Sequence, residues 1–308
     1  MNKYKVSIIG AGQVGGIIAF LLVQKGLADV CLFDIIEGLP QGKALDINQT
    51  AGVEKFDSKV IGSNKYEDIK DSNIVVITAG IARKPGMSRE DLFKTNANIV
   101  KNVACNIKTY SPNSIIIVVT NPLDVLAYLI YKITGFNKNK VMGMAGLLDS
   151  ARFAYFISKE LNVSIKDISS MVLGSHGDSM VPIPRDTTVN GIPITELLSP
   201  DKISELSQKT RDGGAEIVAL LKIGSAYFAP GSCVTAMIES ILEDQKRILP
   251  CSVLLEGEYG LSDVFIGVPV KLGKDGVEEV IKLKLTNQEL EALKKSAGII
   301  KEGLKSIL

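Results

Sequence analysis

The sequence lacks the cysteine pattern of a disulfide or zinc framework. It has four cysteines, and no two of them form a C-x-x-C pair: Cys31, Cys105, Cys233 and Cys251. Cysteines spaced so widely are typical of reduced thiols in the cytosol rather than of covalent staples or structural zinc ligands. We therefore expect a cytoplasmic protein without a bound metal.

The sequence also has almost no excess of charge. Its 35 Lys and Arg residues nearly balance 34 Asp and Glu residues, which leaves a formal net charge of +1. Without a basic excess or a Lys/Arg-rich run, neither nucleic acid nor an anionic membrane surface is the expected partner. A small molecule is the expected ligand instead.

One uncharged run near the N-terminus has the length of a short membrane span but not its composition. The run covers the 18 residues from Val6 to Val23, and four glycines interrupt it: Gly10, Gly12, Gly15 and Gly16. A strand, a tight turn and a helix explain this pattern better than a spanning helix does. We expect no membrane-spanning segment.

The order of patterns in the first half indicates an α/β fold. Short runs rich in Val and Ile predict strands at 4–9, 29–33, 59–62, 74–78 and 115–120. Apolar residues at three and four spacing predict helices at 14–25, 92–110 and 122–134. Because parallel strands joined by right-handed crossovers carry helices on both faces, this order predicts a doubly wound parallel sheet.

After about residue 146 the pattern changes to α+β. Asn190-Gly191 and Asp275-Gly276 each separate two β-prone runs and predict hairpins. Thr286 and Glu289 form a predicted capping box at the start of a final amphipathic helix. A chain of 308 residues is long enough for two domains. We expect a nucleotide-binding domain over 1–146 and a catalytic domain over 147–308.

The first chemical motif is a glycine-rich turn, Gly10-Ala11-Gly12-Gln13-Val14-Gly15. It follows a predicted strand, opens a predicted helix, and precedes Asp34 by 19 residues counted from Gly15. A pyrophosphate would sit at the helix N-terminus, and Asp34 would accept hydrogen bonds from ribose hydroxyls, as in a Rossmann domain. Because a carboxylate repels the 2′-phosphate of NADP, NAD is the expected cofactor. A purely structural turn is the alternative.

Asp149 and Arg152 form a second constellation with His176. Residues three apart share a helix face, so Asp149 and Arg152 can point into one cavity, although a surface ion pair is the common alternative. His176 is the only histidine and lies between two glycines, Gly174 and Gly177. A lone histidine is more often structural, but its ordinary pKa suits proton transfer in a redox reaction at a carbonyl. Asp149 would then fix the tautomer of His176.

A basic stretch over 80–89 is the third candidate. It joins a strand end to a helix and carries three cations, Arg83, Lys84 and Arg89, beside Pro85 and Gly86. Such a segment suits a lid that closes over an anion. A solvated basic turn is the alternative.

With these motifs in place, the whole chain resembles the lactate and malate dehydrogenases. The resemblance rests on four features that occur in the family's order: the glycine fingerprint with Asp34, Thr120-Asn121-Pro122, Leu148-Asp149-Ser150-Ala151-Arg152 and His176-Gly177-Asp178. It implies that His176 accepts the proton and is paired with Asp149. It further implies that Arg152 holds the substrate carboxylate, that Arg89 polarises the carbonyl, and that Asn121 contacts substrate and nicotinamide ribose. Asn96, Val119 and Thr120 would line the NAD site.

The residue at position 83 separates substrates within this family. The lactate enzymes carry a neutral Gln there and the malate enzymes an Arg, as this chain does. A dicarboxylate brings two charges into a dry pocket, and each needs its own cation. The resemblance therefore implies reversible NAD-dependent oxidation of (S)-malate to oxaloacetate by a homodimer or homotetramer. Two departures from the family pattern, Ser175 and Ala154, concern loop geometry rather than chemistry.

Two rival functions remain open at this point. A lactate dehydrogenase, or a broad 2-ketoacid reductase, would have Arg83 turned toward solvent. A sensor that binds NAD without turnover would need only the nucleotide fingerprint, because that fingerprint says nothing about catalysis.

Overall fold

The fold is seen in a computed structural model, which describes residues 4–81 and 89–305 without the side chains of Arg89 and Glu90. A nine-stranded sheet forms its centre, in the order β14-β13-β12-β6-β5-β4-β1-β2-β3. The strands are β1 (Lys5–Ile9), β2 (Asp29–Phe33), β3 (Val60–Ser63), β4 (Ile74–Ile77), β5 (Ile115–Val118), β6 (Val141–Gly143), β12 (Arg247–Glu256), β13 (Ser262–Gly273) and β14 (Gly276–Val280).

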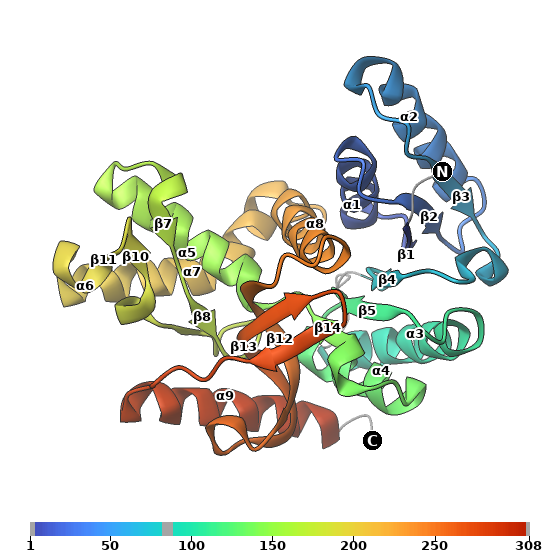
Figure 1. The fold of residues 1–308 in the computed structure, drawn as a ribbon. Coiled ribbons are helices and arrows are strands. Elements are labelled where there is room, and N and C mark those ends of the chain that lie inside the picture. The colour runs from blue at the N-terminus through green and yellow to red at the C-terminus, as the bar shows by residue number, and fades with distance from the viewer. Residues whose placement is uncertain (1–3, 82–88, 306–308) are drawn as a thin grey trace.

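Six of these strands, β1 to β6, are parallel and make up the doubly wound part. Strands β4 and β5 consist of Val and Ile alone and are buried at every position, as expected of strands that are covered on both faces. The helices of this half are α1 (Gln13–Gln24), α2 (Leu39–Glu54), α3 (Arg89–Tyr110) and α4 (Leu123–Thr134). Helix α1 contacts α2, and α3 contacts α4, on opposite sides of the sheet (Figure 1). The predicted fold class is confirmed.

The second half adds an antiparallel extension and a helical layer. Strand β12 joins the parallel sheet through a pairing of Ser252 with Gly143, and β13 and β14 continue it as hairpins. The helices are α5 (Gly146–Leu161), α6 (Ile194–Leu197), α7 (Pro200–Leu221), α8 (Phe228–Leu242) and α9 (Asn287–Lys305). Short strands complete this half: β7 (Ile168–Ser169), β8 (Val172–Leu173), β9 (Val181–Pro182), β10 (Thr188–Val189) and β11 (Ile192–Pro193).

Three local patterns read from the sequence form as predicted. Asn190 and Gly191 both have positive φ and join β10 to β11 in a hairpin. Gly276 likewise closes the β13–β14 hairpin opposite Gly273. At the start of α9, the Thr286 N–H donates to Glu289 and the Glu289 N–H donates to the Thr286 hydroxyl, which is a complete capping box.

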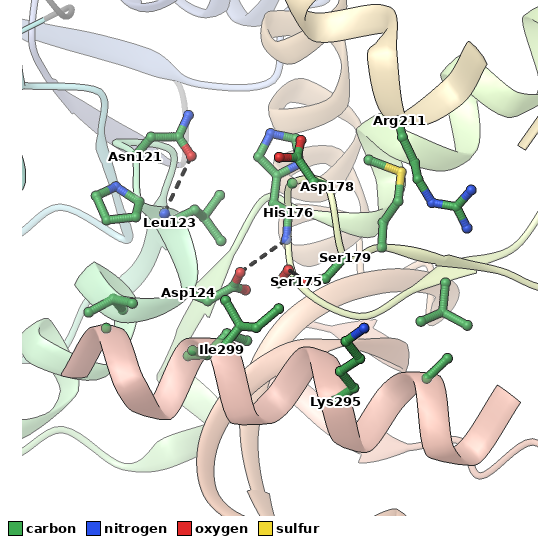
Figure 2. A pocket seen from close by; sticks show the side chains of 18 of the residues that line it. Asn121, Leu123, Asp124, Ser175, His176, Asp178, Ser179, Arg211, Lys295 and Ile299 are labelled. Carbon is green, nitrogen blue, oxygen red and sulfur yellow. Dashed lines mark hydrogen bonds between the residues drawn. The ribbon is translucent and has the colours of Figure 1, made fainter. Parts of the chain in front are cut away.

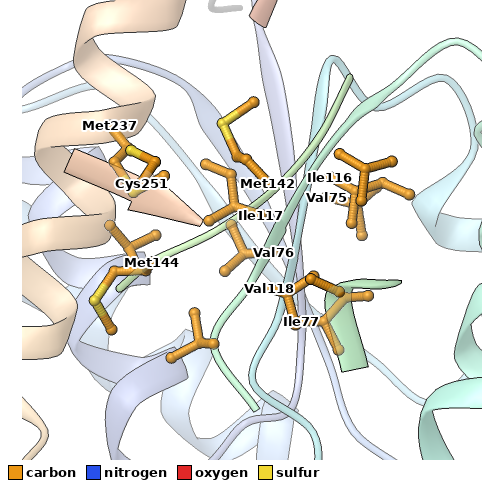
Figure 3. Packing of buried hydrophobic residues seen from close by; sticks show 14 of the residues in the cluster. Val75, Val76, Ile77, Ile116, Ile117, Val118, Met142, Met144, Met237 and Cys251 are labelled. Carbon is orange, nitrogen blue, oxygen red and sulfur yellow. The ribbon is translucent and has the colours of Figure 1, made fainter. Parts of the chain in front are cut away.

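One apolar core runs through both halves of the chain. Figure 3 shows side chains of β4 and β5 near methionines from β6, from the residue after it and from α8, and near a cysteine from β12. The labelled members are Val75, Val76, Ile77, Ile116, Ile117, Val118, Met142, Met144, Met237 and Cys251. A sheet and a core that continue past residue 146 hold the two expected domains together, while the domain boundary itself remains a prediction. Among the residues described, no helix has the length and apolar character needed to cross a bilayer.

Candidate active site

The glycine-rich turn after β1 is shaped by its glycines. Gly10 has a φ of +114°, and a Cβ there would lie 2.7 Å from the Ala79 nitrogen. A Cβ on Gly15 would clash with the Gly10 carbonyl oxygen, so the helix packs closely on the strand end. At Gly12, by contrast, a Cβ would meet nothing within 4 Å. The backbone at the N-terminus of α1 is therefore open to a ligand, which fits a pyrophosphate.

Asp34 lies at the end of β2, beside this turn. Its carboxylate accepts hydrogen bonds from the backbone N–H groups of Ala11 (2.7 Å) and Ile36 (3.0 Å). Each carboxylate oxygen keeps a second lone pair, so the ribose hydroxyls of a dinucleotide can still donate to it. Lys43 of α2 donates to the Gly12 carbonyl at 2.8 Å, a contact that the sequence analysis did not predict. The turn, the acid and the helix N-terminus together fit NAD.

The ends of β4 and β5 are joined by polar side chains. The Asn96 amide oxygen accepts from the Ile81 N–H at 2.9 Å, and the amide nitrogen donates to the Asn121 carbonyl at 3.0 Å. The Thr120 hydroxyl donates to the Ala79 carbonyl at 2.7 Å, and the neighbouring Val119 is buried. These predicted cofactor-site residues thus lie together at the carboxyl edge of the parallel sheet, where open α/β sheets bind ligands.

Asp149, Arg152 and His176 come together as one constellation. Asp149 is only 1% exposed. Its carboxylate lies 3.0 Å from His176 Nδ1 through one oxygen and 3.5 Å from Arg152 Nη1 through the other. Helix α5 presents Asp149 and Arg152 on one face, one turn apart, as the spacing predicts. The surface ion pair that was the alternative is excluded by this burial.

The charges around His176 favour its protonated form. Burial by itself lowers the pKa of His176, and Asp149 opposes this by its charge and by its hydrogen bond. Arg152 lowers the pKa and the charge of Asp124 raises it, so that the net pKa is above the ordinary value. A histidine whose protonated form is stabilised by a buried carboxylate suits general acid–base catalysis.

The Cys233 thiol, which is affected by the charges of this constellation, is unreactive. Burial raises the pKa of Cys233 to about 12, and the charge of Asp149 adds to that effect. Burial also raises the pKa of Cys251 to about 12. Because the thiolate is the reactive form, neither cysteine is a nucleophile here.

Asp124 is a site residue that the sequence analysis missed. It lies in the first turn of α4, three residues after Asn121, and is 5% exposed. Its pKa is raised to about 6, because burial raises the pKa by more than the hydrogen bonds from Ser252 and from the His176 backbone lower it. The signal in the sequence was a single acid within the otherwise uncharged stretch 121–131. An acid in so apolar a helix needs a polar partner elsewhere.

A cavity of about 1120 Å³ opens beside His176. Figure 2 shows Asn121 and Asp124 on one side of it, the loop that carries His176 and Asp178 in the middle, and α9 with Lys295 below. Arg211 of α7 contributes a positive charge to the wall. Apolar side chains such as Leu123 and Ile299 line much of the rest. A mostly apolar pocket with few polar groups is typical of a small-molecule site.

Two predicted substrate contacts cannot be placed. Arg83 lies outside the described residues, and Arg89 begins α3 with its side chain outside them. Within the described part of the chain, no group of His, Cys, Asp and Glu residues is arranged to hold a metal ion.

Comparisons with known proteins agree with this geometry. Residues 4–143 match the family model for the lactate/malate dehydrogenase NAD binding domain, and residues 147–308 match the model for the lactate/malate dehydrogenase alpha/beta C-terminal domain. A malate dehydrogenase from Pelodictyon phaeoclathratiforme is 56% identical over 304 residues, which cover 98% of both chains.

Solved structures give the same result. A malate dehydrogenase from Cryptosporidium parvum superimposes with a TM-score of 0.96 at 45% identity, covering 99% of this chain and 98% of the other. A lactate dehydrogenase from Cryptosporidium parvum, complexed with lactic acid and nicotinamide adenine dinucleotide, reaches 0.95 at 42% identity with the same coverage. The fold alone therefore does not separate the two activities.

Proposed function

We propose, from the premise that the chain belongs to the lactate/malate dehydrogenase family, that it catalyses the NAD-dependent interconversion of (S)-malate and oxaloacetate. One observation carries the proposal. The buried Asp149 carboxylate contacts an imidazole and a guanidinium at once, so that a proton-transfer group and an anion-binding group lie side by side, and the imidazole of this pair lines a cavity.

The residues of the glycine-rich turn would hold NAD. Gly10, Gly12 and Gly15 would shape the turn around the pyrophosphate, and Asp34 would bind the adenosine ribose. Ala11, Gln13 and Val14 complete this contact surface, and Asn96, Val119, Thr120 and Asn121 would border the nicotinamide end. When bound, NAD supplies the hydride acceptor of the reaction.

His176 would exchange the proton of the substrate. Because Nδ1 is hydrogen-bonded to Asp149, the other ring nitrogen, Nε2, would face the reacting hydroxyl. A neutral His176 removes the proton from malate, and a protonated His176 returns it to oxaloacetate. Asp149 keeps the ring in the required tautomer and stabilises the imidazolium.

The arginines would bind the two carboxylates and the carbonyl. Arg152 would clamp the carboxylate next to the reacting carbon through its guanidinium fork. From the sequence, Arg83 would take the far carboxylate and Arg89 would stabilise the charge that develops on the carbonyl oxygen. A protein that only sensed NAD would not need this arrangement, because the buried pair of Asp149 and His176 would then have no function.

Lactate dehydrogenase is the less favoured alternative. Pelodictyon malate dehydrogenase, at 56% identity, is more similar than Cryptosporidium lactate dehydrogenase, at 42%. Arg83 supports the same choice, because the second charge of a dicarboxylate needs a cation.

A parallel assay of two ketoacids tests this proposal. NADH oxidation is followed with oxaloacetate and with pyruvate at matched concentrations, and kcat/KM is expected to be far higher for oxaloacetate. Faster turnover of pyruvate would assign the chain to the lactate enzymes. Tight NADH binding with no turnover of either ketoacid would support the sensor.

We further propose a homodimer or homotetramer. Large apolar side chains at the end of α7 and the start of α8 are exposed: Leu220 by 74%, Ile223 by 90% and Phe228 by 65%. Such a group of apolar side chains is typical of subunit contacts. Light scattering should return two or four times the chain mass, and a monomer at micromolar concentration would contradict the proposal.

A cytoplasmic location is also proposed. All four cysteines are free thiols in this fold, which suits a reducing compartment. Cell fractionation with the oxaloacetate assay as readout tests this location, and activity in a secreted or membrane fraction would contradict it.

A further inference from the structure

The loop that carries His176 is held by three consecutive backbone N–H groups. The Gly174 N–H donates to the Gly267 carbonyl of β13 at 2.9 Å. The Ser175 N–H donates to the Ser296 hydroxyl of α9 at 2.8 Å, and the His176 N–H donates to the Asp124 carboxylate of α4 at 3.0 Å. Three different elements therefore hold three successive residues, and only the catalytic one is met by a charged acceptor.

A buried carboxylate such as that of Asp124 is an energetically costly acceptor for this N–H group. Its burial penalises the carboxylate, whose pKa is raised to about 6. At the neighbouring residue, the neutral hydroxyl of Ser296 satisfies an equivalent N–H without a buried charge. A carboxylate differs from a hydroxyl in two ways: its bond to an N–H is stronger, and it places a full negative charge next to the loop.

The carboxylate is itself fixed in place. One oxygen accepts from the His176 N–H, and the other accepts from the Ser252 hydroxyl of β12 at 2.6 Å. Asp124 therefore cannot turn without breaking a bond on one side. Because it also lies three residues after Asn121, it ties the loop of His176 to the segment that would contact substrate and nicotinamide (Figure 2).

We propose that Asp124 is a positioning residue whose carboxylate fixes the backbone of His176 relative to Asn121. The inference rests on the proposed function, since it assigns a task within that reaction. Asp149 orients the imidazole ring through Nδ1. Asp124 instead sets the position of the His176 main chain, from which the ring projects. A displacement of about 1 Å between reacting groups lowers a rate by up to about 10²-fold, so a loose loop is expected to reduce turnover.

The charge of Asp124 gives the proposal a second readout. Three charged groups of the described chain act on His176: Asp149 and Arg152 from α5, and Asp124 from α4. Of these, Asp149 and Asp124 raise the imidazole pKa and Arg152 lowers it. Removing the charge of Asp124 alone should therefore lower the pKa of His176.

Two substitutions at Asp124 separate these effects. Asp124→Asn keeps the shape and one oxygen acceptor for the His176 N–H but removes the charge. Asp124→Ala removes both. The matched comparison is Ser252→Ala, which deletes the other partner of Asp124 but keeps the carboxylate that accepts from the His176 N–H.

The experiment measures kcat and KM with oxaloacetate and NADH, together with an NMR titration of the imidazole. His176 is the only histidine, so its ring signal needs no assignment. We expect Asp124→Ala to lower kcat by about 10- to 100-fold with the KM for NADH unchanged. Asp124→Asn should recover most of that loss while the imidazole pKa falls. Ser252→Ala should lower kcat less than Asp124→Ala does, because it removes one anchor of the carboxylate but keeps the acceptor of the His176 N–H.

The outcomes distinguish this inference from the proposed function. A wild-type chain that does not reduce oxaloacetate contradicts the proposed function. An active wild type with an unchanged kcat in Asp124→Ala, or with equal losses in the Ala and Asn variants, contradicts the positioning role. If Asp124→Ala does not fold, Asp124→Asn decides: a loss of kcat of about 10- to 100-fold in this variant, which keeps an oxygen acceptor for the His176 N–H, contradicts the positioning role.

Discussion

The cofactor turn (residues 10–15) and the catalytic loop (residues 174–177) are both held in a fixed conformation, but by opposite means. Both follow a strand, and both contain a glycine with positive φ, Gly10 at +114° and Gly174 at +89°. The cofactor turn takes its shape from the absence of side chains, because Gly10 and Gly15 leave no room for a Cβ. The catalytic loop takes its position from distant side chains, Asp124 and Ser296, which accept its N–H groups. One is encoded locally and the other by the tertiary fold.

The largest loss of turnover is expected from a substitution in the catalytic loop. Replacing His176 by Asn removes the group that exchanges the proton but keeps a polar side chain in the loop. Turnover should fall by about 10²- to 10⁴-fold, while NADH binding, measured by fluorescence titration, stays intact. A nearly normal rate would show that another group carries the proton.

The next effect concerns the second cation of the substrate site. Arg83→Gln should remove a charge-assisted contact worth about 1.5 to 3 kcal/mol, or roughly 10- to 200-fold in kcat/KM for oxaloacetate. Pyruvate lacks the far carboxylate, so its kcat/KM should not change. Equal losses for both ketoacids would contradict the role of Arg83 in specificity.

Two alanine substitutions test whether the cofactor turn is encoded by its glycines. Gly15→Ala places a methyl group against the Gly10 carbonyl and should destabilise the fold by about 1–3 kcal/mol, as overpacking does. Gly12→Ala meets open space, so the unfolding midpoint in urea should not change. NADH should nevertheless bind more weakly to this variant, because the methyl group enters the space left for the pyrophosphate. Equal stability losses in both would contradict the distinction.

The smallest effect is a shift along the pH axis. The pKa of His176 lies above its ordinary value of 6.5, and oxaloacetate reduction needs the protonated ring. The kcat/KM for oxaloacetate should therefore fall as pH rises through this raised pKa, by about tenfold per pH unit beyond it. Malate oxidation, which needs the neutral ring, should rise over the same range.

Asp149→Asn gives the matched test of that pH dependence. The carboxylate that raises the pKa of His176 is then missing, so the fall in oxaloacetate reduction should begin at lower pH. An unchanged pH profile in this variant would place the titrating group elsewhere than on His176.

The sequence predicted what depends on neighbours in the chain. The five strands of Val and Ile, the Asn190-Gly191 hairpin and the Thr286/Glu289 capping box are all local patterns, and each is confirmed. Helix α2 was missed because its glycines and scattered apolar residues leave only Pro40, Ala44 and Ile47 buried, so no apolar stripe marks it. Strand β6 was missed because it has only three residues.

The contacts between distant segments could not be predicted in this way. Spacing alone placed Asp149 and Arg152 on one face, but the bond from Ser252 to Asp124 joins residues 128 positions apart. Likewise, Ser296 meets Ser175 across 121 positions. Neither segment has a sequence pattern that identifies its distant partner, so these hydrogen bonds are seen only in the folded chain. The substrate and cofactor roles of the individual site residues stay predictions until the variants are measured.

The continuous sheet has a consequence for how the chain is made. Strand β6 is completed at residue 143, whereas its outer neighbour β12 begins only at residue 247. During synthesis, about 100 residues separate the two, and until β12 emerges β6 presents unpaired backbone groups at the rim of a finished parallel sheet. Exposed strand rims recruit other chains. A nascent or truncated product ending between these strands is therefore the form of this protein most prone to aggregate.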